Sequence, residues 1–159
     1  MTSIAHDTLT FSRLLDAPLS VVWAAFADST QRTVWGVPEG EAQVYDESNF
    51  GVGGRDVYRC GPPETLEFSG IAEYLQIVTE FLIVHTDVVA VEGQVLAAAL
   101  LTWQFESRDG ATQVQLTDQV TSFVGVDMID GHRNGHTKAL EQLRVFVEGL
   151  DEDEIGATQ

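Results

Sequence analysis

The feature that most restricts the fold is a long amphipathic stretch near the C-terminus, which follows a series of strand-like segments. Mainly apolar side chains recur there at helical spacing, and the resulting stripe consists of His136, Ala139, Leu140, Leu143, Phe146, Val147 and Leu150. His132 precedes His136 by four residues, which is helical spacing for a neighbouring pair. We expect the helix to begin between Asp127 and Gly131, because acidic side chains favour a helix start. A curved sheet crossed by one long helix leaves a gap, which we expect to form a pocket.

Segments with strand character precede this helix and are separated by short turns. We expect strands over residues 8–15, 42–48, 55–60, 66–78, 81–91, 96–106 and 112–122. A helix is predicted over residues 19–27, with Pro18 in its first turn, and residues 28–40 are expected to form an ordered connection in which Trp35 fills the core. The pattern predicts the α+β class: one antiparallel sheet with a long helix on its concave face. A strongly curved sheet needs bulges or glycine kinks, and the chain offers Gly53, Gly54 and Gly70 for them.

The composition excludes several classes of partner. The chain has a net charge of −17 and only 8 lysine and arginine residues, so it lacks the basic groups that nucleic acids and anionic membranes require. The acidity favours solubility, with an acidic patch for a basic partner as the alternative. The single cysteine, Cys60, excludes an intramolecular disulfide and a cysteine-based zinc site. Residues 1–7 lack a signal-peptide pattern and the apolar run 95–101 is too short to span a membrane, so we expect a cytoplasmic protein.

Alternation along the last two strands predicts which side chains face the pocket. The inward set is Leu101, Trp103 and Phe105 in one strand, and Val114, Leu116, Asp118 and Val120 in the next. Asp118 therefore lies on an apolar face, where a carboxylate needs a partner. The same reasoning, applied to shorter strands, places Asp56 beside Tyr58 and His85 beside Ile83 and Asp87.

Asp118 supports several competing hypotheses. In one, a polar cluster orients the polar end of a ligand, and its members are Asp118, His85, His136 and Arg133. In another, Asp118 and Arg133 form a structural ion pair and nothing binds. A histidine beside a carboxylate is also a general acid–base pair, suited to cyclisation or dehydration of a ketone.

A metal ion held by His132, His136 and an aspartate is a further alternative. We favour instead one histidine at the helix end and one lining the pocket, because the adjacent Arg133 opposes a cation. We therefore expect neither a metal nor a cofactor.

A family resemblance extends over nearly the whole chain. The residues that carry it are Asp16-Ala17-Pro18, Trp23, Phe26, Trp35, Gly53-Gly54-Arg55, Gly70, residues 73–78, 83–86, 97–105 and 117–119, and Arg133, Gly135 and Leu140. Together they resemble the heat-shock-protein-90 ATPase activator homologue family of the START-like (SRPBCC, birch-pollen-allergen) superfamily. The resemblance implies a helix-grip fold, in which a seven-stranded antiparallel sheet wraps around a long C-terminal helix and two short helices close one end.

The resemblance also implies a central cavity, since relatives bind lipids, sterols, polyketides or plant hormones and some are cyclases. The chain departs from the family pattern at three positions. Asp118 stands where a glutamate is expected, His85 where a tyrosine is expected, and His136 where a small hydroxyl residue is expected.

These observations predict one START-like domain over residues 1–150 and an acidic, disordered tail over residues 151–159. Its predicted function is to bind a small apolar or amphipathic molecule between sheet and helix. The predicted ligand-binding residues are Tyr58, Tyr74, His85, Leu101, Trp103, Phe105, Leu116, Asp118, Arg133, His136 and Leu140. The alternatives are a small cyclase- or dehydratase-type enzyme acting on a ketide-like substrate, and a chaperone ATPase-activator-like interaction module. A homodimer that covers the edge strands and a chaperone are the protein partners considered.

Overall fold

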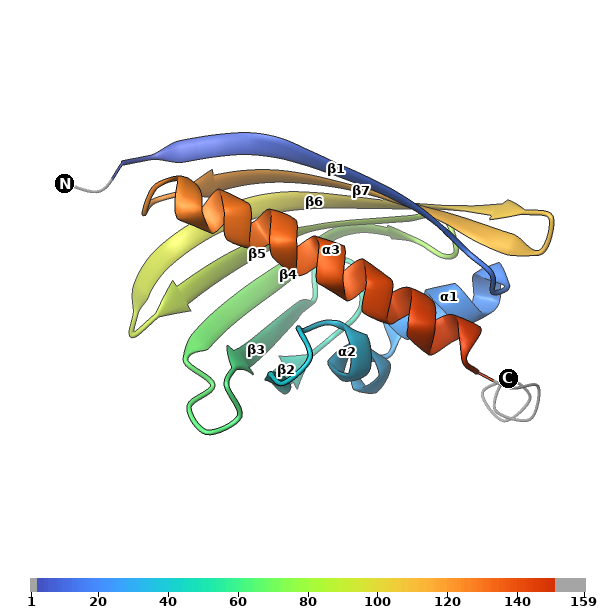
Figure 1. Ribbon diagram of the computed structural model, residues 1–159, viewed down its shortest axis with the longest axis horizontal. Helices are drawn as coiled ribbons and strands as arrows, with labels where there is room; N and C mark the ends of the chain where they lie inside the picture. The colour runs from blue at the N-terminus through green and yellow to red at the C-terminus, as the bar shows by residue number, and fades with distance from the viewer. Residues whose placement is uncertain (1–2, 151–159) are drawn as a thin grey trace.

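A computed structural model describes residues 3–150, and the acidic tail predicted for residues 151–159 lies outside them. A curved antiparallel sheet grips one long helix, α3 (Val126–Glu148), and two short helices, α1 (Leu19–Ala27) and α2 (Ser29–Trp35), close one end (Figure 1). The strands are β1 (Ala5–Leu15), β2 (Ala42–Ser48), β3 (Arg55–Gly61), β4 (Phe68–Val78), β5 (Leu82–Val91), β6 (Gln94–Arg108) and β7 (Ala111–Ser122). The predicted α+β helix-grip fold is confirmed.

The sheet has the order β1-β7-β6-β5-β4-β3-β2, so each strand pairs with its neighbour in sequence except β1, which pairs with the last strand. This pairing places Leu9 of β1 opposite Asp118 of β7, and Leu101 of β6 lies on the other side of Asp118. Asp118 therefore occupies the middle of three paired strands. The edge strands are β1 and β2.

β-Bulges interrupt the pairing of the sheet at three positions. Pairing registers shift so that one residue is left over at Asp46 in β2, at Leu75 in β4 and at Leu96 in β6. Gly53 instead lies in the turn before β3, with φ of 81°, a backbone conformation that suits glycine. Gly70 lies inside β4, paired with Tyr58.

The helices differ from the sequence prediction at their starts. α1 has the predicted bounds, but Pro18 is its N-cap residue rather than part of the first turn. α2 was not predicted as a helix. It begins after Asp28, whose side chain accepts a hydrogen bond from the backbone N–H of Thr30 at 2.9 Å. α3 begins at Val126, one residue before the predicted interval.

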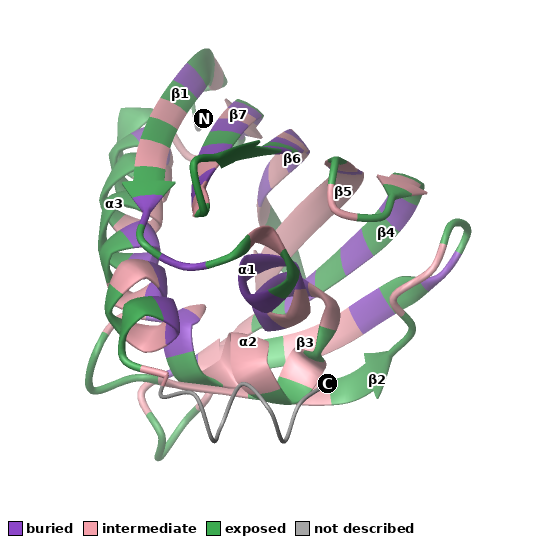
Figure 2. Ribbon diagram, turned by 90° about the vertical axis from the view of Figure 1, so that its right-hand side faces the viewer, coloured by how far each residue is buried: buried purple, intermediate pink, exposed green. Residues whose placement is uncertain are grey.

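The core lies between the concave face of the sheet and the three helices, and along β6 and β7 buried residues alternate with intermediate or exposed ones (Figure 2). The inward set predicted for these strands is buried throughout, and Asp118 has no exposed surface. Trp35 is 5% exposed and its indole N–H donates to the carbonyl of Ala25 at 3.0 Å, so its predicted role in filling the core is confirmed. No helix within residues 3–150 is long and apolar enough to cross a membrane.

Candidate ligand-binding site

A cavity of about 230 Å³ lies between the sheet, α2 and α3. Its apolar wall includes Phe26, Ile83, Leu101, Trp103 and Ala139. Its polar wall comes mainly from α2 and from strands β2 to β5, and includes Arg32, Gln43, Tyr45, Asp56, Tyr58, Tyr74, His85 and Asp87. One side of the cavity is therefore hydrophobic and the other carries hydrogen-bonding groups.

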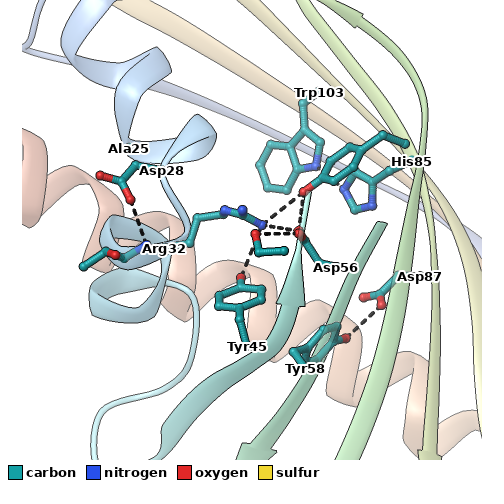
Figure 3. A network of polar contacts seen from close by, with 12 residues as sticks. Ala25, Asp28, Arg32, Tyr45, Asp56, Tyr58, His85, Asp87 and Trp103 are labelled. Carbon is teal, nitrogen blue, oxygen red and sulfur yellow. Dashed lines mark hydrogen bonds and ion pairs between the residues drawn. The ribbon is translucent and has the colours of Figure 1, made fainter. Parts of the chain in front are cut away.

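Arg32 is the central group of the polar wall and projects from α2 toward β3 (Figure 3). Its Nη1 donates to Asp56 at 2.5 Å, to the Tyr74 hydroxyl at 3.0 Å and to the Tyr45 hydroxyl at 3.3 Å. The other two nitrogens, Nε and Nη2, are buried and have no hydrogen-bond partner among residues 3–150. The Nη1 atom of Arg32 is thus hydrogen-bonded, whereas the Nε–Nη2 edge of its guanidinium group has no partner among these residues.

Asp56 balances the charge of Arg32. It is 1% exposed, and it accepts further hydrogen bonds from the Tyr74 hydroxyl at 2.5 Å and the Ser48 hydroxyl at 2.8 Å. Burial by itself would raise the pKa of Asp56, but the hydrogen bonds from Tyr74 and Arg32 and the charge of Arg32 lower it below its ordinary value. Asp56 is therefore an anion, and the buried pair it forms with Arg32 has no net charge.

Tyr58 and Asp87 form a second pair in the cavity wall, in which the Tyr58 hydroxyl donates to Asp87 Oδ1 at 2.8 Å (Figure 3). Burial raises the pKa of Asp87 and also raises the pKa of Tyr58. The Asp87 carboxyl is therefore easier to protonate than an exposed one, unlike that of Asp56.

His85 is held by hydrogen bonds at both ring nitrogens. Its Nδ1 lies 3.0 Å from the carbonyl of Thr86, which can only accept, so Nδ1 carries the hydrogen. Its Nε2 accepts from the indole N–H of Trp103 at 3.1 Å, and burial lowers the pKa of His85. His85 is therefore a neutral ring with a fixed tautomer, and its hydrogen bonds go to Thr86 and Trp103 rather than to Asp118.

Asp118 instead contacts two histidines of α3. Its Oδ2 lies 2.8 Å from His132 Nδ1 and 2.8 Å from His136 Nε2. Burial would raise the pKa of Asp118, but the hydrogen bonds from His132 and His136 bring it down to about 2. The other carboxylate oxygen, Oδ1, is buried without a hydrogen-bond partner in the described part of the chain.

Arg133 does not join this cluster, which corrects two expectations. Its guanidinium group is half exposed and lies 3.6 Å from the carboxylate of Asp7, so neither the polar cluster with Arg133 nor the ion pair of Arg133 with Asp118 is found. The helix turns by about 100° per residue, and Arg133 therefore faces outward when His132 faces Asp118. Of the two histidines, His136 lines the cavity as expected, and His132 does not line it but contacts the same carboxylate.

The structure brings only part of the predicted ligand-binding set together. Six of these residues line the cavity: Tyr58, Tyr74, His85, Leu101, Trp103 and His136. Phe105, Leu116 and Leu140 instead pack in the core, each 3% exposed or less. The sequence prediction missed Arg32, Tyr45 and Gln43. The one sequence feature that could have indicated Arg32 was its basic side chain close to Trp35, the predicted core tryptophan.

Sequence and structure comparisons agree on the family. The family model for the Activator of Hsp90 ATPase homolog 1-like protein matches residues 16–148. The chain belongs to this family. No curated protein matches the chain significantly.

Solved structures of similar bacterial proteins have the same fold as this chain. An uncharacterised protein of Rhizobium leguminosarum is 25% identical with a TM-score of 0.81, over 93% of this chain and 98% of that one. A protein of Rhizobium loti is 27% identical with a TM-score of 0.77, over 90% of this chain and 98% of that one. A protein of Chromobacterium violaceum, 24% identical with a TM-score of 0.76 over 89% of this chain and 96% of that one, is similar in fold alone.

Proposed function

We propose that the chain binds a small, largely apolar molecule that carries a carbonyl-type hydrogen-bond acceptor. The observations that carry this proposal are that Arg32 lines the cavity and that its buried Nε and Nη2 have no hydrogen-bond partner among the described residues. Buried donors are almost always paired, and an unpaired one costs about 1–3 kcal/mol. A ligand oxygen directed at this edge removes that cost, whereas a purely apolar ligand does not.

The charge balance favours a neutral acceptor over an anion. Asp56 already compensates Arg32, and the whole chain carries a charge of −17. A carboxylate ligand would therefore add a second negative charge to a neutral buried pair, and its desolvation would be poorly repaid. A ketone, lactone or amide oxygen accepts the same two N–H groups without this cost. The amide of Gln43, whose Oε1 also lacks a described partner, suits a hydroxyl or N–H elsewhere on the ligand.

The volume favours a compact ligand. A cavity of about 230 Å³ suits a molecule with one or two rings. Typical drug-sized pockets are larger, at about 300–1,000 Å³. A long-chain lipid or a sterol would need the walls to move apart.

Binding is better supported than proton transfer by the groups present. Both nitrogens of His85 are occupied, and Asp118, which does not line the cavity, is bound by His132 and by His136, of which only His136 lines the cavity. An acid–base pair for cyclisation or dehydration needs a group free to exchange a proton with the substrate. The cyclase-type alternative keeps one such pair, His136 and Asp118, but the unpaired nitrogens of Arg32 favour binding.

A matched set of three probes tests the proposal by calorimetric titration: 2-acetylnaphthalene, 2-naphthoate and 2-ethylnaphthalene. They have similar sizes, and they offer the Arg32 edge a neutral acceptor, an anion and no acceptor. We expect the ketone to bind about tenfold more tightly than the ethyl compound, which is the worth of one good hydrogen bond of about 1.4 kcal/mol. We expect the carboxylate to bind more weakly than the ketone.

The matched variant for this titration is Arg32→Lys, which keeps a positive charge for Asp56 and removes the forked edge. The preference for the ketone over the ethyl compound should disappear in this variant. Equal affinities for the two compounds in the unaltered protein, or an unchanged preference in Arg32→Lys, would overturn the proposal. Mass spectrometry of a solvent extract of the purified protein then gives the mass of any retained molecule.

A further inference from the structure

Three potential metal ligands meet between β7 and α3, beside the cavity but apart from its polar wall. They are a carboxylate oxygen of Asp118, Nδ1 of His132 and Nε2 of His136, and all three atoms lie within 4.8 Å of one another. The histidines are one helical turn apart, and their ring centroids are 5.9 Å apart. Their side chains are 12% and 18% exposed, whereas Asp118 is fully buried, so solvent reaches the group from the α3 side.

We propose that Asp118, His132 and His136 bind a divalent first-row transition-metal ion such as Zn²⁺. Two imidazoles spaced by one helical turn and a carboxylate are borderline ligands, which suit zinc, cobalt, nickel or iron. Calcium and magnesium require mainly oxygen ligands, and this site offers one carboxylate. The proposal is independent of the ligand proposed for the cavity.

The unpartnered oxygen of Asp118 is a second observation that points to a ligand. Asp118 Oδ1 is fully buried and lacks a hydrogen-bond partner among the described residues, although its neighbour Oδ2 contacts both histidines. Buried carboxylate oxygens are normally satisfied. An ion bound to this carboxylate would use that spare capacity, with either one or both oxygens coordinating.

The distances are close to those that an ion needs. Metal–ligand bonds of about 2.0–2.2 Å place neighbouring ligand atoms roughly 3.0–3.5 Å apart. Each nitrogen now lies 2.8 Å from Oδ2, and all three atoms lie within 4.8 Å of one another, so the imidazoles must shift to make room for an ion between them and the carboxylate. Asp118 is fixed between Leu9 and Leu101 in the sheet, whereas the histidines lie on a helix surface that can adjust.

The local charge also favours a cation. With neutral imidazoles the group carries the single negative charge of Asp118. The nearest basic residue in sequence, Arg133, is directed away and paired with Asp7, so its positive charge is compensated outside the site. Three protein ligands leave at least one coordination position open, as in metal sites that bind water or a small molecule. His136 also lines the cavity, so an ion here would bind next to the proposed ligand site.

The test is titration of the metal-free, full-length protein with Zn²⁺ by calorimetry and with Co²⁺ by visible absorption. We expect one equivalent to bind in the micromolar range or more tightly, with Co²⁺ bands characteristic of mixed nitrogen and oxygen ligands. His132→Gln, His136→Gln and Asp118→Asn should each weaken binding by at least about tenfold. His6→Gln is the matched control, because His6 lies on β1 outside the group, and it should bind as the unaltered protein does.

Two further measurements keep the result interpretable. A full-length variant with Asp151, Glu152, Asp153 and Glu154 changed to amides excludes binding by these acidic residues. Because Asp118→Asn can disturb folding, imidazole NMR signals of the unaltered protein are followed as Zn²⁺ is added. Signals of His132 and His136 should shift while those of His6 and His85 stay. No saturable binding at one equivalent, or shifts elsewhere instead, would mean that the group is a hydrogen-bonded structural triad and would overturn the proposal.

Discussion

Tyr58 of β3 crosses directly over Gly70 of β4, its paired residue, and can do so only because Gly70 has no side chain. A Cβ atom on Gly70 would overlap the ring and the hydroxyl oxygen of Tyr58. The space above Gly70 therefore lets the hydroxyl reach Asp87 on β5. Glycine at this position therefore shapes the polar wall of the cavity.

Gly70→Ala should therefore displace the Tyr58 ring and break its bond to Asp87. We expect the free energy of unfolding to fall by about 1–3 kcal/mol, the usual cost of an overpacked site, as measured by urea denaturation. In a Tyr58→Ala background the same change should cost much less, because the ring it collides with is gone. Equal costs in both backgrounds would show that the close approach of Tyr58 does not restrict Gly70.

Gly135 gives the opposite prediction, because a Cβ added there meets no atom within 4 Å. It lies inside α3, where glycine is about 0.8–1.0 kcal/mol less favourable than alanine. Gly135→Ala should therefore raise the free energy of unfolding by about 0.5–1 kcal/mol in the same urea experiment. A loss of stability would mean that α3 makes a contact at this position that the open surface does not suggest.

The strands and the direction of Asp118 could be predicted because alternation is a strong signal in long strands. Along β7, inward and outward side chains alternate over twelve residues. Once the direction of one side chain is assigned, the directions of all the others follow. In β4 the same reasoning is limited by the bulge at Leu75, which shifts the phase after Tyr74. The burial of Tyr74 follows from the pattern before the bulge.

The helical side of the site was harder to predict. α2 has only seven residues, and threonine, valine and tryptophan are poor helix formers, so tertiary packing and the Asp28 cap determine it. Arg32 was missed for that reason. On α3, a stripe that runs from His136 through Leu140 extends back to His132, not to Arg133. The helical period therefore indicates that His132, and not Arg133, lies on the inward stripe. The expected start of the helix nevertheless suggested that His132 was terminal.

Arg32 and Asp56 should behave as one energetic unit. Replacing Arg32 alone with methionine leaves Asp56 buried and unpaired, and we expect a loss of about 3–5 kcal/mol in the free energy of unfolding. The double variant Arg32→Met, Asp56→Leu removes both charges and should recover most of that loss. Urea denaturation of the single and double variants measures the coupling, and additive losses would contradict a unit of this kind.

Asp56 and Asp87 should give opposite pH signatures, because their pKa values are shifted in opposite directions. The pKa of Asp56 is lowered below 3.8 mainly by bonds from Tyr74 and Arg32 that outweigh burial, so its ionised form stabilises the fold. That stability is present above the unfolded pKa of about 4 and is lost as the pH falls through the lower folded value. Asp56→Asn should therefore be less stable than the unaltered protein at pH 7, and the difference should shrink in acid.

For Asp87 the sign reverses, because burial raises its pKa above 3.8 and the folded state binds the proton more tightly than the unfolded chain does. The stability of the unaltered protein should then fall as the pH rises from about 4 through the raised pKa. Asp87→Asn keeps an acceptor for the Tyr58 hydroxyl but has no charge to bury, so its melting temperature at pH 7 should be higher. The two proteins should converge near pH 4. If Asp87→Asn is instead less stable than the unaltered protein at pH 7, another group in the cavity wall compensates the charge of Asp87. That result would contradict the raised pKa of Asp87.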